Sequence, residues 1–164
     1  MTKQELDFKL IYEENHSRIM RLCMGYVARD QDLANDLTQE VFIKVWRNLK
    51  SFKNESNIST WIYRIAVNTC LMNLRKNRSS RSLNIIESKD LVESDNQSEE
   101  VENQYKQMYR CIDTLSATNK AIVMMELEGM AQKEIANIMG LKHEAVRTRI
   151  HRIKTQLSKC VNHE

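Results

Sequence analysis

The stretch that decides the fold is residues 131–157, AQKEIANIMGLKHEAVRTRIHRIKTQL. Its apolar residues recur at helical spacing on both sides of Gly140, and glycine suits the left-handed backbone that ends a helix. Ile135, Ile138 and Leu141 are placed to pack the angle between two helices. We therefore predict a helix, a tight turn at residues 139–141 and a second helix, which together form a helix-turn-helix.

The second of these helices has two different faces. Its apolar residues recur at intervals of four, three and four and form a buried stripe: Val146, Ile150, Ile153 and Leu157. The outward side is polar and mostly basic: Arg147, Thr148, His151 and, toward one edge, Arg152. Such a face offers hydrogen-bond donors to bases and phosphates in a major groove, and Arg149, nearer the apolar border, is better placed for a phosphate. A solvated basic helix at the end of a bundle is the alternative.

The composition of the whole chain is that of a helical protein. The 164 residues are 41% apolar and 29% charged, with no proline and only three glycines. A β-sandwich needs many tight turns, whereas abundant Leu, Ile, Met, Glu, Lys and Arg favour helices. We predict an all-α fold of two small helical domains joined by a flexible acidic linker.

The domain boundaries follow from periodicity. Residues 1–80 are predicted to hold three helices around one core: one over residues 5–27, one over residues 33–49 with Asp30 or Asp32 as its cap, and one opened by Trp61 with Ser59 or Thr60 as its cap. Residues 81–103 are rich in Ser, Asn, Asp and Glu and have weak periodicity, so we predict a linker there, with room for a transient helix near its end. Residues 104–164 form the second domain.

Charge is distributed unevenly along the chain. The formal net charge is only +3, and residues 1–55 are balanced, with nine basic and nine acidic side chains. Residues 56–86 hold five basic residues and no acid, residues 87–102 hold seven acids against one lysine, and residues 142–159 hold six basic residues against one acid. Two basic patches separated by an acidic segment predict two contacts with one long polyanion.

Several classes of function lack their sequence signals. The four cysteines are Cys23, Cys70, Cys111 and Cys160; they stand far apart without a CxxC pair, so we predict buried, reduced thiols and no zinc site. The start is charged and the longest apolar runs are about five residues, which predicts a cytoplasmic protein without membrane insertion. No glycine-rich phosphate loop, nucleophile–base pair or metal set is present, so we expect neither enzymatic activity nor a cofactor.

The stretch at residues 58–78, ISTWIYRIAVNTCLMNLRKNR, combines groups that suit unpaired DNA and carries no carboxylate: Trp61, Tyr63, Asn68, Arg75, Lys76 and Arg78. Aromatic faces stabilise unpaired bases by stacking, an amide can donate to and accept from a base edge, and basic side chains hold phosphates. For Trp61 a packing role in the core is favoured over stacking, and Asn68 is the better candidate for direct readout.

A polar patch is expected on the second predicted helix. Asp36, Gln39 and Glu40 are related by three and four residues and therefore share one face. Residue chemistry alone favours a solvated surface, and docking on a basic partner protein is the alternative.

Three segments taken together resemble a sigma factor of bacterial RNA polymerase. They are DLTQEVFIKVWRNLKSF (residues 36–52), STWIYRIAVNTCLMNLRK (residues 59–76) and LEGMAQKEIANIMGLKHEAVRTRIHRIKTQL (residues 127–157). The small size and short linker resemble the extracytoplasmic-function (ECF) group, which retains only conserved regions 2 and 4. The likeness covers nearly the whole chain outside the linker, in the same order and spacing.

The resemblance implies a role for each segment. Asp36, Gln39 and Glu40 match the segment that docks on the coiled-coil of the polymerase β′ clamp, and residues 51–59 match a loop that captures a flipped base. Region 2 thereby binds core polymerase and recognises and melts the −10 element through Trp61, Tyr63 and Asn68. Region 4 recognises the −35 element through its helix-turn-helix, and the positions that match are Arg147, Thr148, His151 and Arg152.

The same resemblance implies a set of partners: core RNA polymerase through its β′ clamp and β flap, promoter DNA, and an anti-sigma factor that is commonly membrane-bound. Two positions depart from the family pattern. Ser116 stands where many relatives have proline, and His151 stands where other side chains are common. A self-sufficient helix-turn-helix repressor or activator is the main alternative, and an enzyme or RNA-binding protein with a basic helix is a remote one.

Overall fold

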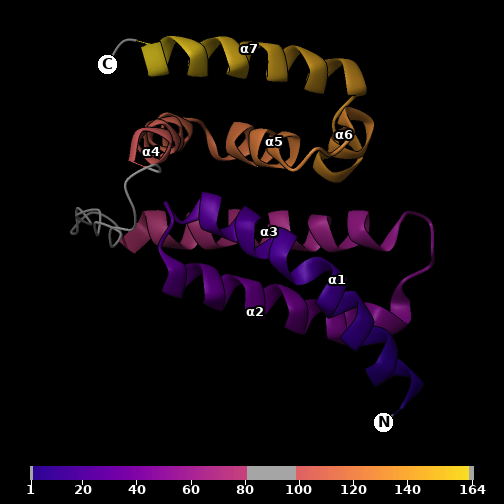
Figure 1. Cartoon of the computed structure of the whole chain (residues 1–164). Helices are drawn as coiled ribbons and strands as arrows, with labels where there is room; N and C mark the ends of the chain where they lie inside the picture. Colours follow the sequence, from indigo (N-terminus) through magenta and orange to yellow (C-terminus); the bar gives the residue numbers. More distant parts are fainter. Residues whose placement is uncertain (1, 81–98, 163–164) are drawn as a thin grey trace.

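The structure is a computed structural model that describes residues 2–80 and 99–162, and within these residues it is helical without a β-strand. The helices are α1 (Lys3–Tyr26), α2 (Gln31–Asn48), α3 (Ile58–Ser80), α4 (Glu99–Asp113), α5 (Ala117–Leu127), α6 (Gln132–Met139) and α7 (His143–Asn162), with a short 3-10 helix η1 (Leu49–Ser51) after α2. The prediction of an all-α fold is confirmed. In Figure 1 the helices form layers, with α2 at one side, α1 and α3 next, then α4 to α6, and α7 at the opposite side.

The N-terminal unit consists of α1, α2 and α3, which pack against one another. Thr2 and Glu5 form a capping box at the start of α1, and Asp30 caps α2 by accepting from the backbone N–H of Leu33 at 3.2 Å. The prediction that Ser59 or Thr60 caps α3 is wrong. Helix α3 begins at Ile58, and the side chain of Asn57 accepts from the backbone N–H of Ser59 at 3.1 Å.

The C-terminal unit begins earlier than expected. Helix α4 starts at Glu99, so the last residues of the segment predicted as a linker, 99–103, are helical. The acids Glu99, Glu100 and Glu102 lie in its first turn, where a negative charge is favourable to the helix dipole. Residues 81–98, which carry the rest of the predicted linker, lie outside the described residues.

The structure shows what Ser116 does at the position where many relatives have proline. Its hydroxyl accepts from the backbone N–H of Asn119 at 3.3 Å and caps α5, so a hydroxyl cap starts this helix.

The helix-turn-helix is formed by α6 and α7, and Gly140 ends α6 with φ 66° in the left-handed region. The predicted stripe is confirmed for Val146, Ile150 and Ile153, which are buried, whereas its fourth member, Leu157, is half-buried against the same core.

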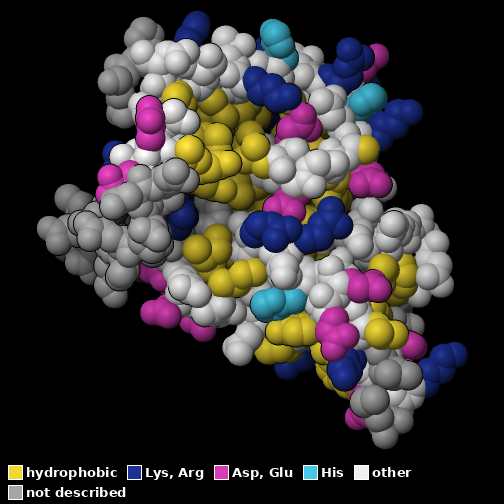
Figure 2. All heavy atoms as spheres, in the orientation of Figure 1, with side chains coloured by type: hydrophobic (Ala, Val, Ile, Leu, Met, Phe, Trp, Pro, Cys, Tyr) yellow, Lys and Arg dark blue, Asp and Glu magenta, His cyan; other side chains and the backbone are white. Residues whose placement is uncertain are grey.

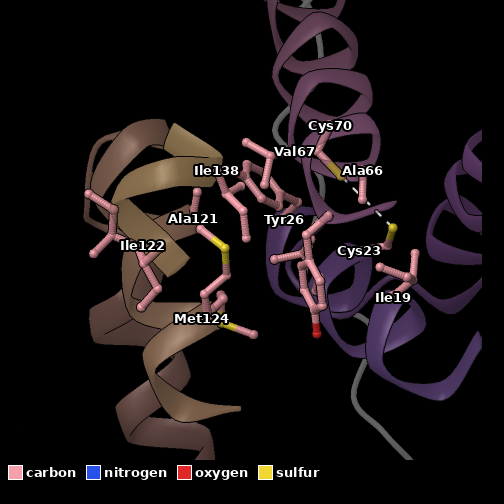
Figure 3. Packing of buried hydrophobic residues seen from close by; sticks show 14 of the residues in the cluster. Ile19, Cys23, Tyr26, Ala66, Val67, Cys70, Ala121, Ile122, Met124 and Ile138 are labelled. Atoms are coloured by element: carbon pink, nitrogen blue, oxygen red, sulfur yellow. Dashed lines mark hydrogen bonds between the residues drawn. The ribbon is translucent and has the colours of Figure 1, made fainter. Parts of the chain in front are cut away.

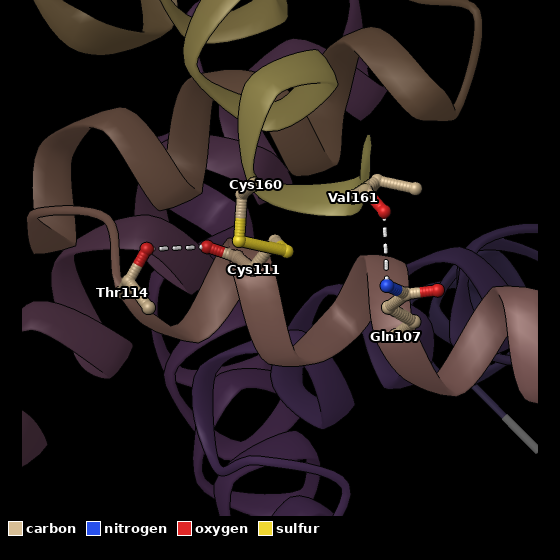
Figure 4. The surroundings of a disulfide bond; sticks show 5 residues. All are labelled: Gln107, Cys111, Thr114, Cys160 and Val161. Carbon is tan, nitrogen blue, oxygen red and sulfur yellow. Dashed lines mark hydrogen bonds between the residues drawn. A yellow bond between two sulfur atoms is a disulfide. The ribbon is translucent and has the colours of Figure 1, made fainter. Parts of the chain in front are cut away.

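The cysteines form two pairs in space. Cys111 of α4 and Cys160 of α7 are joined by a disulfide, and beside it Gln107 donates to the backbone oxygen of Val161 at 2.9 Å (Figure 4). The prediction of reduced thiols is therefore wrong for this pair. Cys23 and Cys70 are free and buried, and their sulfur atoms are 3.8 Å apart. The contact with Cys23, together with burial, raises the pKa of the Cys70 thiol.

The two units share one continuous hydrophobic core. Helix α1 packs on α5, and α3 packs on α6. In Figure 3 side chains of α1 and α3, among them Tyr26 and Val67, meet Met124 and Ile138 from the C-terminal unit. The layer of α4 to α6 is thus enclosed between the N-terminal unit and α7.

Candidate functional site

Three surfaces carry the residues that the sequence singles out, and the first lies on α2. Asp36, Gln39 and Glu40 are all exposed on one side of this helix. Glu40 forms an ion pair with Lys44 at 2.9 Å, one turn further along α2. Leu37 and Val41 point into the core and hold the helix in place, so the three polar side chains form one accessible patch.

An aromatic groove adjoins this patch, and the sequence analysis missed it. It runs between α1 and α2 and is lined by Phe8, Tyr12, His16, Asn35, Thr38, Gln39, Phe42, Ile43 and Trp46. The rings contact one another, with 5.1 Å between the centroids of Phe8 and Trp46 and 4.8 Å between those of Tyr12 and Phe42. Ile43 and Trp46 remain 50% and 37% exposed. Gln39 belongs to both surfaces, so the patch and the groove form one continuous face with a polar and an apolar part.

The second surface lies along α3, where some of the predicted DNA-contacting residues are exposed and others are buried. Asn68, Arg75 and Lys76 are exposed. Trp61 is half-buried against the core, with its ring centroid 5.1 Å from that of Phe52, which agrees with the favoured packing role. Arg78 lies in the last turns of α3, and its side chain is outside the described part of the chain.

Tyr63 differs from the other predicted residues of α3 because it is fully buried. The guanidinium of Arg18 lies 5.8 Å from its ring centroid. Burial raises the pKa of the Tyr63 hydroxyl, and the nearby Arg18 charge opposes this shift. In this arrangement Tyr63 has no face available to a base.

Residues 51–59, which run from the end of η1 through a loop into the first turn of α3, present polar groups. The backbone of Asn54 is left-handed, with φ 55°, and Asn54 is exposed. Phe52 anchors the loop through its contact with Trp61. The loop therefore has a fixed apolar base and an accessible polar tip.

The third surface is the outward face of α7. All of its predicted base-reading side chains are exposed: Arg147, Thr148, His151 and Arg152. Arg149 is half-buried and donates to the side-chain oxygen of Asn119 on α5 at 3.2 Å. Figure 2 shows Lys, Arg and His side chains along the edge of the molecule that α7 forms. The prediction that this helix turns one basic face outward is confirmed.

Among residues 2–80 and 99–162, no group of three or more His, Cys, Asp or Glu side chains could hold a metal ion. No helix in this part of the chain has the length and apolar character needed to cross a membrane.

Comparison with known families places both units. Residues 11–80 match the family described as Sigma-70 region 2, and residues 105–157 match the family described as Sigma-70, region 4. The first covers α1 to α3 with the α2 patch, and the second covers the helix-turn-helix with the basic face of α7.

Curated relatives match over nearly the full length. The RNA polymerase sigma-H factor of Pseudomonas aeruginosa is 30% identical over 168 residues, covering 94% of this chain and 86% of the relative. The ECF RNA polymerase sigma-E factor of Escherichia coli K12 is 32% identical over 167 residues, with the same coverage of 94% and 86%.

Solved structures share the fold. The sigma factor RpoE in complex with the anti-sigma factor NepR from Bartonella quintana has a TM-score of 0.77 at 22% identity, covering 95% of this chain and 97% of that one. CnrH in complex with the cytosolic domain of CnrY has a TM-score of 0.73 at 19% identity, covering 98% and 90%. With two matched regions in order and relatives similar over nearly the whole length, the chain belongs to the extracytoplasmic-function group of the sigma-70 family, and it is a promoter-recognising factor of transcription initiation.

Proposed function

We propose that the chain binds core RNA polymerase through its N-terminal domain, residues 1–80, and reads the −35 element through its C-terminal domain, residues 104–164 together with the start of α4. The observation that carries this proposal is the face of α7. Its apolar stripe is buried in the helix-turn-helix while Arg147, His151 and Arg152 are exposed. A helix with this division fits a major groove and presents donors to base edges.

The α2 face is the proposed polymerase contact. Asp36, Gln39 and Glu40 offer two carboxylates and an amide, which suit a basic partner surface such as the coiled-coil of the β′ clamp. The aromatic groove beside Gln39 adds apolar area to the same face. Charged rims around apolar centres are common in protein interfaces.

The α3 face is the proposed −10 contact. Asn68 can pair with a base edge, and Arg75 and Lys76 can hold phosphates of the displaced strand. Residues 51–59 would receive a flipped base at the polar tip of the loop. The region 2 and region 4 families match separate units. The N-terminal unit would therefore melt the −10 element, and the C-terminal unit would bind the −35 element upstream.

Two structures of similar fold contain anti-sigma factors or a cytosolic partner domain, which supports an anti-sigma factor as a partner of this chain as well. The chain would act in the cytoplasm beside RNA polymerase, with the β flap as a second contact. It would carry no catalysis of its own and need no cofactor, because polymerisation belongs to the core enzyme.

Run-off transcription tests the proposal. Core polymerase is supplied with a library of genomic promoter fragments, with and without the chain. We expect discrete promoter-specific transcripts only when the chain is present. A chain that binds DNA tightly by itself and leaves the transcripts unchanged would act as a repressor or activator of another class.

A further inference from the structure

We propose that Cys23 and Cys70 form a modification site, where a hydroperoxide oxidises the two thiols to a disulfide between α1 and α3, and that this bond weakens polymerase binding by the α2 patch. The oxidation itself concerns the free chain alone. Its effect on polymerase rests on the proposed docking role of Asp36, Gln39 and Glu40.

The four cysteines are paired within the two units in the same way. In each unit one cysteine lies on the first helix and one on the last: Cys23 on α1 and Cys70 on α3, Cys111 on α4 and Cys160 on α7. The C-terminal pair is joined covalently. The N-terminal pair is free, and its sulfur atoms lie 3.8 Å apart, the contact that Figure 3 draws as a dashed line. The N-terminal unit thus has the same arrangement without the bond.

The two free thiols are chemically unequal, which suits an attacking and a resolving cysteine. The hydrogen bond with Cys70 lowers the pKa of the Cys23 thiol; burial opposes this shift, and the hydroxyl of Thr38 adds to it. The same contact raises the pKa of the Cys70 thiol. Because the thiolate is the reactive nucleophile, Cys23 attacks first while Cys70 stays protonated beside it.

The hydroperoxide, ROOH, is the only co-reactant that the oxidation needs. The Cys23 sulfur attacks one oxygen of ROOH; the O–O bond breaks, the sulfur becomes a sulfenic acid, and ROH leaves with the thiol proton. The Cys70 sulfur, 3.8 Å away, then attacks the Cys23 sulfur. An S–S bond forms, the S–O bond breaks, and the hydroxyl leaves as water with the Cys70 proton. Two thiols thereby lose two electrons and two protons, and ROOH is reduced to ROH and water.

The aromatic groove between α1 and α2 provides access to the buried pair. Cys23 and Cys70 are fully buried, but Thr38 lines the groove and its hydroxyl contacts Cys23 from the other side. The same hydroxyl lies 3.4 Å from the sulfur of Met20, which is only half-buried. One small side chain therefore separates the groove from Cys23. A local fluctuation admits a small hydroperoxide but not a glutathione molecule, so Cys70 is the thiol that resolves the sulfenic acid.

Side-chain contacts link Cys70 to the α2 patch. Its neighbour on α3, Thr69, accepts a hydrogen bond from Nζ of Lys44 at 3.1 Å. Lys44 also pairs with Glu40 of the patch at 2.9 Å. The charge of Glu40 raises the pKa of the Cys70 thiol and that of Lys44 lowers it, so both charges act at the sulfur. Lys44 thus connects the proposed docking face with the part of α3 that carries Cys70.

Disulfide formation changes the position of α3. An S–S bond is about 2.0 Å long, so the sulfur atoms of Cys23 and Cys70 must approach by about 1.8 Å from their present 3.8 Å. Buried side chains such as Ala66 and Val67 pack in the same core, and a close-packed interior does not absorb such a change locally. Helix α3 therefore shifts toward α1. The contact between Thr69 and Lys44 changes with it, and Glu40 is displaced from its place in the patch.

Peptide mapping of the full-length chain tests the oxidation. The chain is treated with tert-butyl hydroperoxide, denatured in N-ethylmaleimide and digested with trypsin, which places the four cysteines in four different peptides. We expect the peptides of residues 22–29 and 65–75 to be joined after treatment. Without treatment both should be separate and carry N-ethylmaleimide. The two single variants test the roles of the thiols: oxidised Cys23 is expected in Cys70→Ser, and an unmodified thiol at Cys70 in Cys23→Ser.

Polymerase affinity tests the effect on docking. Treated and untreated chains are desalted, circular dichroism confirms that they are folded, and binding to core polymerase is measured by fluorescence anisotropy without reductant. We expect the treated parent to bind about fivefold more weakly, the change that corresponds to one displaced surface charge contact. Treated Cys70→Ser should bind like the untreated variant, which also controls for oxidised methionines. Thr69→Val lacks the hydroxyl that holds Lys44, so treatment should not change its affinity.

Two results would overturn the proposal. One is a treated parent in which Cys23 and Cys70 both still carry N-ethylmaleimide, or in which Cys23 is oxidised without the joined peptide. The other is a joined peptide with unchanged polymerase affinity. Continued sensitivity of Thr69→Val to treatment would refute the route through Lys44. An untreated parent that does not bind polymerase would instead contradict the proposed function, and the joined peptide would still establish the oxidation.

Discussion

Cys160 at the end of α7 is joined by a disulfide to Cys111 of α4, so the proposed −35-reading helix is tied covalently to the first helix of its unit. The two residues are 49 positions apart in sequence. The tie closes a loop that includes α5 and the whole helix-turn-helix (Figure 4).

Reduction of this disulfide should destabilise the chain. A cross-link over a loop of this length restricts the unfolded chain, and its loss costs about 2–4 kcal/mol. Urea unfolding followed by circular dichroism, with and without dithiothreitol, measures the difference. The Cys111→Ser/Cys160→Ser variant should unfold like the reduced chain under both conditions. Equal midpoints for the parent chain with and without reductant would show that the disulfide does not contribute.

Removing the α2 patch should abolish polymerase binding and leave the fold intact. Asp36, Gln39 and Glu40 are exposed, so an Asp36→Ala/Gln39→Ala/Glu40→Ala variant loses little beyond the ion pair of Glu40 with Lys44. Surface plasmon resonance with immobilised core polymerase should show a loss of at least tenfold in affinity. Removal of these side chains would leave charged groups of the partner unpaired in the interface.

A control for this variant is available on α1. Asp7, Glu13 and Glu14 are also exposed, and a triple alanine variant there makes a comparable change away from the patch. Polymerase affinity similar to that of the parent is expected for the control. If both triple variants bind as well as the parent, α2 is not the docking face.

A change of charge at Asn68 should reduce open-complex formation more than a change of side-chain size. It is exposed, so neither Asn68→Ala nor Asn68→Asp should change the thermal midpoint by more than about one or two degrees. Asn68→Asp adds a negative charge where the strand approaches, and we expect open-complex formation, read by permanganate footprinting, to fall further than with Asn68→Ala. Equal effects of the two substitutions would mean that Asn68 does not face the strand.

Arg147 and Arg149 of α7 should contribute to DNA binding in different ways. Arg147→Ala should lower affinity for the −35 element by about 1–3 kcal/mol and change the preferred sequence, as expected for a base contact. Arg149 bonds Asn119, so Arg149→Ala should weaken binding to all sequences and also lower stability. Selection from a randomised −35 library, followed by sequencing, separates these outcomes. Lys154, on α7 but paired with Glu126, is the control, and its alanine variant should keep the parent's preference.

Acid should weaken the ion pair between Glu128 and Arg21. The hydrogen bonds from Arg21 lower the pKa of this carboxyl below its ordinary value, and partial burial opposes the shift. A lowered pKa in the folded chain means that the ionised Glu128 contributes fully to stability above the ordinary carboxyl range, and that this contribution is lost as pH falls through the lowered value. The thermal midpoint of Glu128→Gln should lie below that of the parent at pH 7, and the difference should shrink as the pH falls below the ordinary carboxyl range. A constant difference across this range would exclude ionisation of Glu128 as the cause.

The sequence predicted the local architecture well, for reasons that particular residues make clear. Gly140 and the stripe of Val146, Ile150 and Ile153 predicted the helix-turn-helix, because helix ends and helix faces depend on neighbours within one or two turns. The cap of α3 was misplaced, since Asn57, Ser59 and Thr60 are all adequate cap residues and local chemistry does not choose among them. The exposed α2 patch and α7 face followed directly from the buried residues opposite them.

The sequence by itself determined which segments are helical, which face of each helix is apolar and which residues stand outward. Only the tertiary structure decided that Cys111 meets Cys160, that Tyr63 is buried and that Glu128 joins Arg21. These pairs are far apart along the chain, 107 residues for Arg21 and Glu128, and their meeting depends on how whole helices pack. The periodicity of apolar residues predicts which face of a helix is buried. Which helix covers that face depends on how the two surfaces fit, as Gly25 of α1 fits against Met124 of α5.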